Sequence, residues 1–320
     1  MECRLGLKRG AKPSLGELPR ELSWRTWRRL RKTSTWRTSY TRRLRVLRSS
    51  WLKEVEEKVV EALKRKGSVL IAFSGGVDSS VVAALAFKAL KEKAVAITFK
   101  SPLHPPWELE EAEEIAEEIG VKHLTVDVNE LELSDVANNT PNRCYFCKSL
   151  RFSKAVELAS KLKLNCVVDG TNADDVKQWR PGLRALKELG IHSPLLEAGL
   201  GEREVRELAK ELGLAVSEKP HSSCLATRFP YGRRLSVELL RRVAEAEKIV
   251  KEVAGVKQVR VRDHGDLARV EVEASEHKRL VEGHVAQTLA SRLKKLGYRF
   301  VSLDLEGYRF GSFDRGMRYG

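Results

Sequence analysis

Residues 68–80 read SVLIAFSGGVDSS. The apolar run 68–73 is typical of a short buried strand, and the apolar residues of 81–90 have the spacing of a helix. A glycine-rich turn between a strand and a helix directs backbone N–H groups and the helix N-terminus at an anion. We therefore expect residues 74–80 to bind phosphate groups.

The residue types in this turn support the same prediction. Gly75 and Gly76 let the backbone approach phosphate oxygens, because neither carries a Cβ. Asp78 can hold Mg²⁺ against the phosphates. Hydroxyl donors come from Ser74, Ser79 and Ser80. The Gly-Lys-Ser/Thr ending of a Walker loop is missing, and the alternative is an ordinary strand-to-helix turn.

The heptad SGGVDSS resembles the pyrophosphate loop, or PP loop, of the ATP pyrophosphatase superfamily. Those enzymes cleave ATP between its α- and β-phosphates and adenylate a substrate. The resemblance implies that ATP and Mg²⁺ bind here, with adenine against Ala72 and Phe99. The residues expected to hold the phosphates are Ser74, Gly75, Gly76, Val77, Asp78, Ser79 and Ser80.

Composition places the chain among globular proteins. It has 320 residues, 42% apolar and 32% charged, which predicts one large or two ordinary domains. No apolar run approaches the roughly 18–20 residues that cross a bilayer, and the N-terminus lacks the apolar region of a secretory signal. Five cysteines without a dense framework favour a reducing compartment. We expect a cytoplasmic protein.

The net charge of +15 is concentrated near the N-terminus. Residues 1–50 hold fifteen Lys and Arg against three Glu, so about +3 remains on the rest of the chain. Nucleic-acid binding by the folded body is therefore not favoured, although arginines interleaved with tryptophan can bind single strands or anionic lipid. We expect residues 1–50 to be a disordered extension, or to precede the true start of translation.

Strand and helix patterns alternate from residue 51 onward. Strands are predicted at 68–73, 94–99, 121–128 and 166–169, and helices at 51–65, 81–90, 107–119 and 148–162. This order predicts an α/β fold, a Rossmann-like parallel sheet in an α/β/α sandwich. Ligands bind beyond the carboxyl ends of such strands. The glycine turn, Phe99 and the segment Asp169–Asn172 all follow strand ends.

The pattern changes after residue 232. Helices are predicted at 236–253 and 277–296, with strands at 259–261, 268–272 and 300–305. These elements predict a smaller C-terminal α+β domain. The expected division is 1–50, 51–232 and 233–320.

Polar residues cluster after the fourth strand. We expect Asp169, Thr171, Asn172 and Asp174 to line the nucleotide site, although Asp, Asn and Thr are also common in turns and helix caps. Arg180 either contacts phosphate or caps a helix.

Three cysteines form a second candidate site. Cys144 and Cys147 make a C-x-x-C pair, and Cys224 lies far downstream. The trio could leave one iron of a [4Fe–4S] cluster open, hold Zn²⁺ with His221 or His104, or serve as a redox pair with an unrelated thiol. Spacing alone leaves all three open. Cys166 lies in a buried strand pattern.

Longer stretches resemble the LarE family of ATP-dependent sulfur transferases in nickel-pincer nucleotide biosynthesis. They are NTPNRCYFCK (139–148), DGTNADD (169–175), RPGLRALKELGIHSPL (180–195), SSCLATRFPYG (222–232), VRVRDHGDLARVEV (259–272) and GYRFVSLDLEGYR (297–309). The resemblance implies adenylation of a carboxylate of pyridinium-3,5-dicarboxylate mononucleotide, then conversion to a thiocarboxylate. It also implies that Cys144, Cys147 and Cys224 hold a [4Fe–4S] cluster, and we expect a homo-oligomer.

Catalytic roles follow from this resemblance. Asp78 is expected to serve the adenylation, and Cys224 also matches the region of the cysteine whose sulfur some members sacrifice. Arg228, Arg260 and Arg262 are candidates for the substrate's phosphate and carboxylates, because guanidinium groups pair bidentately with both. The alternative for Arg260 and Arg262 is a solvated edge strand. Two other functions stay open: a tRNA thiolase of the same superfamily, or a non-catalytic ATP-binding module.

Overall fold

The computed structural model describes residues 34–177, 180–220 and 222–309, with side chains from residue 50 onward. The chain divides into two compact units, residues 1–53 and 54–320. Helix α2 (Ser34–Lys66) begins well before the predicted start at residue 51, so part of the predicted extension is helical. Residues 1–33 lie outside the described residues. The division at residues 50 and 232 stays a prediction.

The predicted parallel sheet is confirmed. Four strands lie in the order β3-β2-β1-β4, and all neighbouring pairs are parallel. Their bounds are β1 (Val69–Ala72), β2 (Ala94–Lys100), β3 (Lys122–Asp127) and β4 (Cys166–Val168). Every strand was placed to within two residues of its ends. This agreement reflects near-continuous apolar runs, which sheets covered on both faces require.

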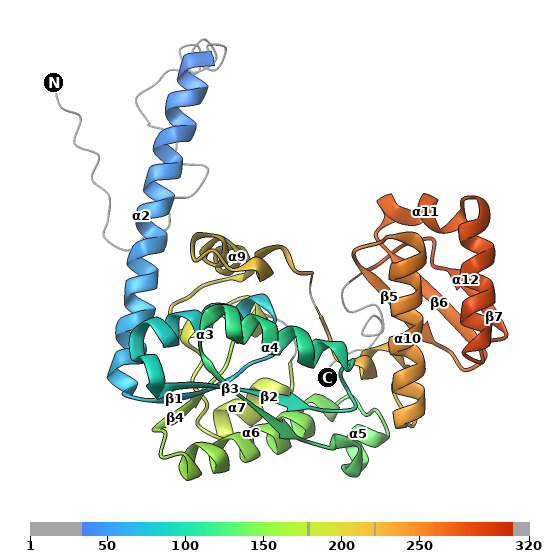
Figure 1. Ribbon diagram of the computed structural model, residues 1–320, viewed down its shortest axis with the longest axis horizontal. Coiled ribbons are helices and arrows are strands. Elements are labelled where there is room, and N and C mark those ends of the chain that lie inside the picture. The colour runs from blue at the N-terminus through green and yellow to red at the C-terminus, as the bar shows by residue number, and fades with distance from the viewer. Residues whose placement is uncertain (1–33, 178–179, 221, 310–320) are drawn as a thin grey trace. The chain divides into compact units, whose positions relative to one another are not determined.

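Helices cover both faces of this sheet (Figure 1). Helices α3 (Val77–Leu90) and α4 (Trp107–Ile119) lie on one side, and α6 (Arg143–Lys161) and α7 (Gly182–Glu188) lie on the other. On the α6 side, Leu70, Ile97 and Phe152 belong to one buried cluster. Shorter helices connect these elements: α5 (Ser134–Ala137), α8 (Pro194–Glu197) and α9 (Glu202–Glu211).

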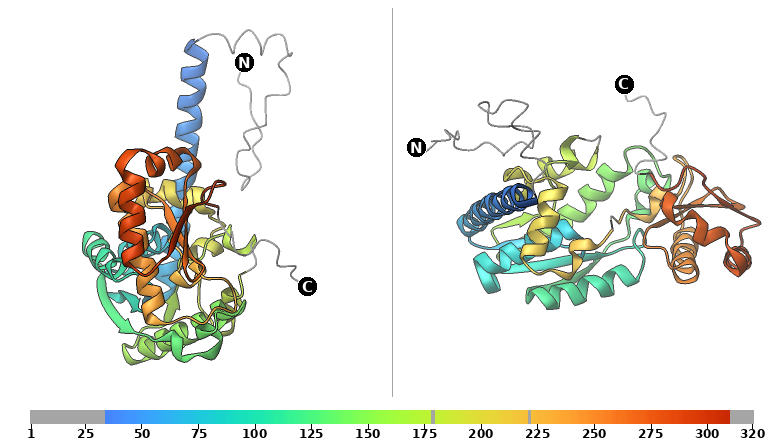
Figure 2. Two further views of the ribbon diagram at one scale, coloured as in Figure 1. Left: turned by 90° about the vertical axis from the view of Figure 1, so that its right-hand side faces the viewer. Right: turned by 90° about the horizontal axis from the view of Figure 1, so that it is seen from above.

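A second, three-stranded sheet follows, as predicted. Strands β5 (Val259–Asp263) and β6 (Leu267–Val272) are antiparallel, and β7 (Phe300–Leu303) pairs with β6 in parallel. These strands and the helices packed on them form the last part of the chain, coloured orange to red in Figure 2. The sheet therefore has mixed polarity.

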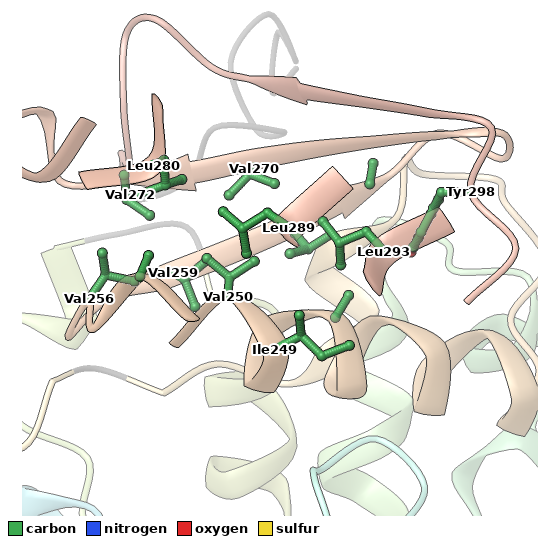
Figure 3. Close-up of a cluster of buried hydrophobic side chains, with 14 residues drawn as sticks. Ile249, Val250, Val256, Val259, Val270, Val272, Leu280, Leu289, Leu293 and Tyr298 are labelled. Atoms are coloured by element: carbon green, nitrogen blue, oxygen red, sulfur yellow. The ribbon is translucent and has the colours of Figure 1, made fainter. Parts of the chain in front are cut away.

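Two helices cover one face of this second sheet and complete its core. Ile249 and Val250 of α10 (Val237–Ala254) and Leu289 and Leu293 of α12 (Gly283–Lys295) meet the valines of β5 and β6, as Figure 3 shows. One helix was predicted over 277–296. The structure has two, α11 (His277–Val281) and α12, because the backbone is extended at residue 282 and Gly283 has a φ of 51°. No helix among the described residues is long and apolar enough to span a membrane.

Candidate active site

A cavity of about 870 Å³ opens at the carboxyl ends of the parallel strands. Its walls include the glycine turn, the ends of β2, β3 and β4, and one face of α6. The predicted nucleotide-binding residues that line it are Ala72, Ser74, Gly76, Asp78, Ser79, Phe99, Asp169 and Thr171. The cavity therefore lies where an open α/β sheet binds its ligands.

The glycine turn has a backbone that only glycine allows. Gly75 has a φ of 64°, and a Cβ there would lie 3.0 Å from Cα of Ala112 in α4. Ser79 Oγ donates to the carbonyl of Gly76 (3.1 Å) and accepts from the N–H of Ser74 (3.2 Å). Gly76 is the N-cap of α3 and supplies no side-chain acceptor to the first turn. A helix N-terminus without a side-chain cap suits an anion.

The end of β4 packs directly against this turn. A Cβ on Gly170 would lie 2.8 Å from the backbone nitrogen of Ser79, so no larger residue fits without moving the backbone. Asn172 Nδ2 donates to Asp78 Oδ1 at 3.2 Å. Residues about 90 positions apart thereby form one wall, which fixes the direction of the Asp78 carboxylate.

Other predicted nucleotide-binding residues have structural contacts. Asp174 accepts from the N–H of Glu202, the first residue of α9 (2.8 Å), and pairs with Lys177. Arg180 forms an ion pair with Asp175 at 2.8 Å. Val77 and Ser80 are buried in α3. The roles of these residues toward ATP stay predictions.

The three cysteines lie near one another at the start of α6, where Cys144 and Cys224 both act on the pKa of Cys147. That helix begins at residue 143, not at 148 as predicted, so Cys144 and Cys147 share one face of its first turn. Cys224 precedes a short 3₁₀ helix (Leu225–Arg228), and both Cys147 and Cys224 pack against the apolar cluster around Phe229. Lys148 and Leu225, the chain neighbours of these two cysteines, line the cavity. The thiols therefore adjoin the site formed by the glycine turn.

Charges around the thiols are mostly positive. Burial raises the pKa of Cys147 to about 12, with Arg151 opposing the rise and Glu130 adding to it. Burial alone would lower the pKa of Arg143 and of Arg228, but nearby anionic groups outweigh it, and Cys224 contributes in both cases. At neutral pH the burial of Cys147 therefore disfavours its thiolate, and Arg151 offsets this effect only in part.

The predicted metal site is not shown by the structure. Three thiols among guanidinium groups suit a thiolate-ligated cluster in donor type. Within the described ranges, however, no three His, Cys, Asp or Glu side chains are arranged so that they could hold a metal ion. His104 pairs with Glu108 instead (2.9 Å), and His221 lies outside the described residues.

The arginines predicted to bind substrate are buried, so the alternative of a solvated edge strand is wrong. Arg228 pairs with Glu247 through two hydrogen bonds (2.7 and 3.0 Å). Arg262 donates to Glu271 and to the carbonyl of Thr227, both at 2.7 Å. Burial lowers the pKa of Arg260 to about 10, with Arg228 adding to the effect. None of the three arginines lines the cavity.

Several cavity residues escaped sequence analysis. Arg151 reaches across the cavity wall to Ser101 (3.1 Å), to His104 (3.1 Å) and to the fully buried Glu130. Lys148 lies one residue after Cys147 on the same helix. The helical spacing of Cys144, Cys147, Lys148 and Arg151 was the available signal. Nothing local marks Glu130, which lies between strand and helix patterns.

The chain resembles proteins of known and unknown activity. Residues 50–149 match the asparagine synthase family. An uncharacterised Synechocystis protein is 43% identical over 246 residues, covering 77% of this chain and 91% of that protein. Pyridinium-3,5-bisthiocarboxylic acid mononucleotide synthase of Lactiplantibacillus plantarum is 36% identical over 255 residues, covering 79% and 91%. A tRNA-specific 2-thiouridylase of Halothermothrix orenii is 29% identical over 196 residues, covering 48% and 54%.

Proposed function

Because the chain belongs to the LarE family of PP-loop proteins, we propose that it is an ATP-dependent sulfur transferase of nickel-pincer cofactor biosynthesis. Its substrate is pyridinium-3,5-dicarboxylate mononucleotide, one carboxylate of which becomes a thiocarboxylate. One observation carries the proposal: a single cavity joins the glycine turn to the residues that flank Cys147 and Cys224. An activated carboxyl formed at one end can thus meet sulfur at the other.

The first step activates the carboxylate. A carboxylate oxygen attacks the α-phosphorus of ATP and forms an O–P bond, while the bond to the β-phosphate oxygen breaks and pyrophosphate leaves with the electron pair. The amides of residues 74–79 bind the departing phosphates, and Asp78 would hold Mg²⁺, whose charge offsets theirs. Adenine lies against Ala72 and Phe99. Thr171 and Asp169 complete the wall, and Asn172 holds the Asp78 carboxylate.

The second step replaces oxygen by sulfur. A thiolate attacks the acyl carbon of the adenylate, and AMP leaves with the electrons of its C–O bond. Where Cys224 supplies the sulfur, its attack gives a thioester to the enzyme; a base then takes the Cα proton, the Cβ–Sγ bond breaks with its electrons on sulfur, and the thiocarboxylate leaves dehydroalanine at position 224. Alternatively, Cys144, Cys147 and Cys224 would hold a [4Fe–4S] cluster, which when bound supplies sulfide. Arg143, Arg151 and Arg228 stabilise negative charge at either source.

Arg228, Arg260 and Arg262 recognise the substrate's anionic groups in this proposal. The positions of these arginines support this role. All three are buried, Arg228 belongs to the segment that follows Cys224, and Arg262 contacts that segment at Thr227. Arginines held in place by carboxylates lose little conformational freedom on binding. We further propose domains at 51–232 and 233–320, a homo-oligomer and a cytoplasmic location.

The product tests this function. Purified protein should convert the dicarboxylate mononucleotide and ATP into AMP, pyrophosphate and a nucleotide heavier by the exchange of one oxygen for one sulfur, seen by mass spectrometry. Pyrophosphate formed equally without the mononucleotide would overturn the substrate assignment. No pyrophosphate formed with it would leave a non-catalytic ATP-binding module as the better account.

A tRNA thiolase is the second candidate, favoured by the similarity to tRNA-specific 2-thiouridylase and by the basic residues 1–50. That function requires a tRNA complex that weakens steeply with salt and is lost when residues 1–50 are deleted. We expect neither tRNA-dependent pyrophosphate release nor sulfur in tRNA. Either result would favour the thiolase.

The metal content of the purified protein tests whether the three cysteines hold a cluster. Protein purified under argon should contain iron and acid-labile sulfide, and Cys144→Ala should lose most of both, because removing one of three thiolates opens the cluster. Cys166→Ala is the matched control, since Cys166 lies on β4 and the groups acting on its pKa include none of the trio. Stoichiometric zinc would refute the cluster. A protein that contains neither iron nor zinc would favour Cys224 as a sacrificial donor.

A further inference from the structure

We propose that Lys148 is a catalytic residue of the adenylation step, where its ammonium group binds the α-phosphate oxygens of ATP. This inference rests on the proposed function and adds a residue to it. Lys148 lines the same cavity as Asp78, Ser79 and Gly170. It projects from α6, and its chain neighbour Cys147 belongs to the cysteine trio. It is thus a cation between the phosphate end and the sulfur end of the site.

The ammonium group has hydrogen bonds left to give. Its nearest carboxylate oxygen, Oδ2 of Asp169, lies 3.9 Å away, which is beyond hydrogen-bond distance. Within the described part of the chain, no hydrogen bond of Lys148 Nζ is found. An ammonium group has three donors, so an anion entering the cavity finds them available.

Asp169 does not depend on Lys148 for its orientation. Its Oδ1 accepts from Ser193 Oγ (2.6 Å) and from the N–H of Thr171 (3.2 Å), and its Oδ2 accepts from Thr171 Oγ1 (2.5 Å). A lysine kept only to neutralise this carboxylate would approach it closely. The structure instead holds the two charges apart, and the carboxylate keeps the ammonium near the end of β4.

The aliphatic part of Lys148 is held in place by its surroundings. Gly182, the first residue of α7, has no Cβ, and one placed there would lie 2.8 Å from Cδ of Lys148 and 3.3 Å from its Cγ. On the other side, Nζ lies 5.8 Å from the centre of the Phe152 ring. These contacts direct the charged end into the cavity, so little reorganisation is needed during reaction.

The chemistry needs a cation at this place. When the carboxylate oxygen attacks the α-phosphorus and the bond to pyrophosphate breaks, negative charge grows on the α-phosphoryl oxygens. The glycine turn acts on the leaving phosphates, and Asp78 would hold the Mg²⁺ that offsets their charge. Lys148 faces them from the sulfur side, where the carboxylate must lie, and donates to the α-phosphoryl oxygens without giving up its proton.

Two substitutions test the role. Lys148→Met keeps the stem and removes the charge, and is expected to lower kcat of mononucleotide-dependent ATP–pyrophosphate exchange by about 100-fold, with the KM for ATP changed by less than about threefold. Lys148→Arg should recover at least about tenfold of that loss, because it restores a cation. Lys161→Met is the matched control: it removes a lysine from the same helix whose partner, Glu157, is exposed.

A third variant leaves the charge in place. Gly182→Ala should displace the stem of Lys148 and lower exchange by about tenfold, while thermal unfolding and the iron and sulfide content stay near those of the wild type. Wild-type exchange in Lys148→Met would refute this role and leave the proposed function intact. A loss shared by Lys148→Arg and accompanied by lower thermal stability would identify a structural lysine. No exchange in the wild type would instead refute the proposed function.

Discussion

Asp78→Asn is expected to lower mononucleotide-dependent pyrophosphate formation by on the order of 1,000-fold, because the variant loses the charge that would hold Mg²⁺. Asparagine has the same size and keeps the Oδ1 that accepts from Asn172, so the turn and the end of β4 should stay together. The loss should therefore appear in kcat rather than in the fold. Pyrophosphate release followed by an enzyme-coupled assay measures it.

Two controls accompany this experiment. Glu157→Gln removes an exposed carboxylate of α6 that pairs with Lys161 at the surface, and should change the rate by less than about threefold. Iron and sulfide content of Asp78→Asn should match the wild type, because Asp78 lies in the glycine turn and not among the thiols. Undiminished pyrophosphate formation would show that the turn does not bind ATP as described.

Glu247→Ala is expected to destabilise the protein by about 3–5 kcal/mol, the usual result of leaving one charge of a buried pair without its partner. Glu247 and Arg228 are 6% and 2% exposed. The same carboxylate accepts from the backbone N–H of Val261 in β5 (3.0 Å), which would lose its acceptor too. Urea unfolding at pH 7 measures the change in free energy of unfolding.

A double variant separates stability from function. Arg228→Met with Glu247→Leu replaces the pair by apolar side chains of similar volume and should regain most of the lost stability. It should stay inactive in sulfur transfer, because Arg228 also donates to the carbonyls of Ser223 and Cys224. A loss below about 1 kcal/mol in Glu247→Ala would mean that the pair behaves as an exposed one.

Lowering the pH should remove the stabilisation that the Glu247 carboxylate contributes. Burial alone would raise the pKa of Glu247, but Arg228 and Arg260 outweigh burial and hold it below the ordinary value of 4.5. A carboxyl whose pKa is lowered in the folded state contributes its full stabilisation at pH values above its pKa in the unfolded state. This contribution is lost as the pH falls through its pKa in the folded state. The stability difference between wild type and Glu247→Gln should therefore shrink below pH 4.5.

Local sequence signals were sufficient for the first sheet and its glycine turn. Buried parallel strands appear in the sequence as continuous apolar runs, and the left-handed backbone at Gly75 favours glycine. The site at the strand ends follows from topology alone. The LarE resemblance added the family, which the identity to the Lactiplantibacillus protein confirms.

Features that depend on tertiary contacts could not be predicted from the sequence. The first turn of helix α6 packs Phe146 and Cys147 against a cluster that includes Leu225 and Phe229, some eighty positions away, so no local apolar repeat marks it. Arginine at 262 is typical of an exposed strand, yet Glu271 on the neighbouring strand makes its burial possible. Glu130 is buried only because Ser101 and Arg151 meet it there.

The most direct test of the central claim is ATP–pyrophosphate exchange with the dicarboxylate mononucleotide as acid. Labelled pyrophosphate should enter ATP only when that substrate is present and sulfur transfer is blocked, for example in Cys224→Ser, because a reversible acyl adenylate must form first. Label entering ATP without the substrate, or none entering with it, would contradict the account that this cavity activates a carboxylate for attack by sulfur.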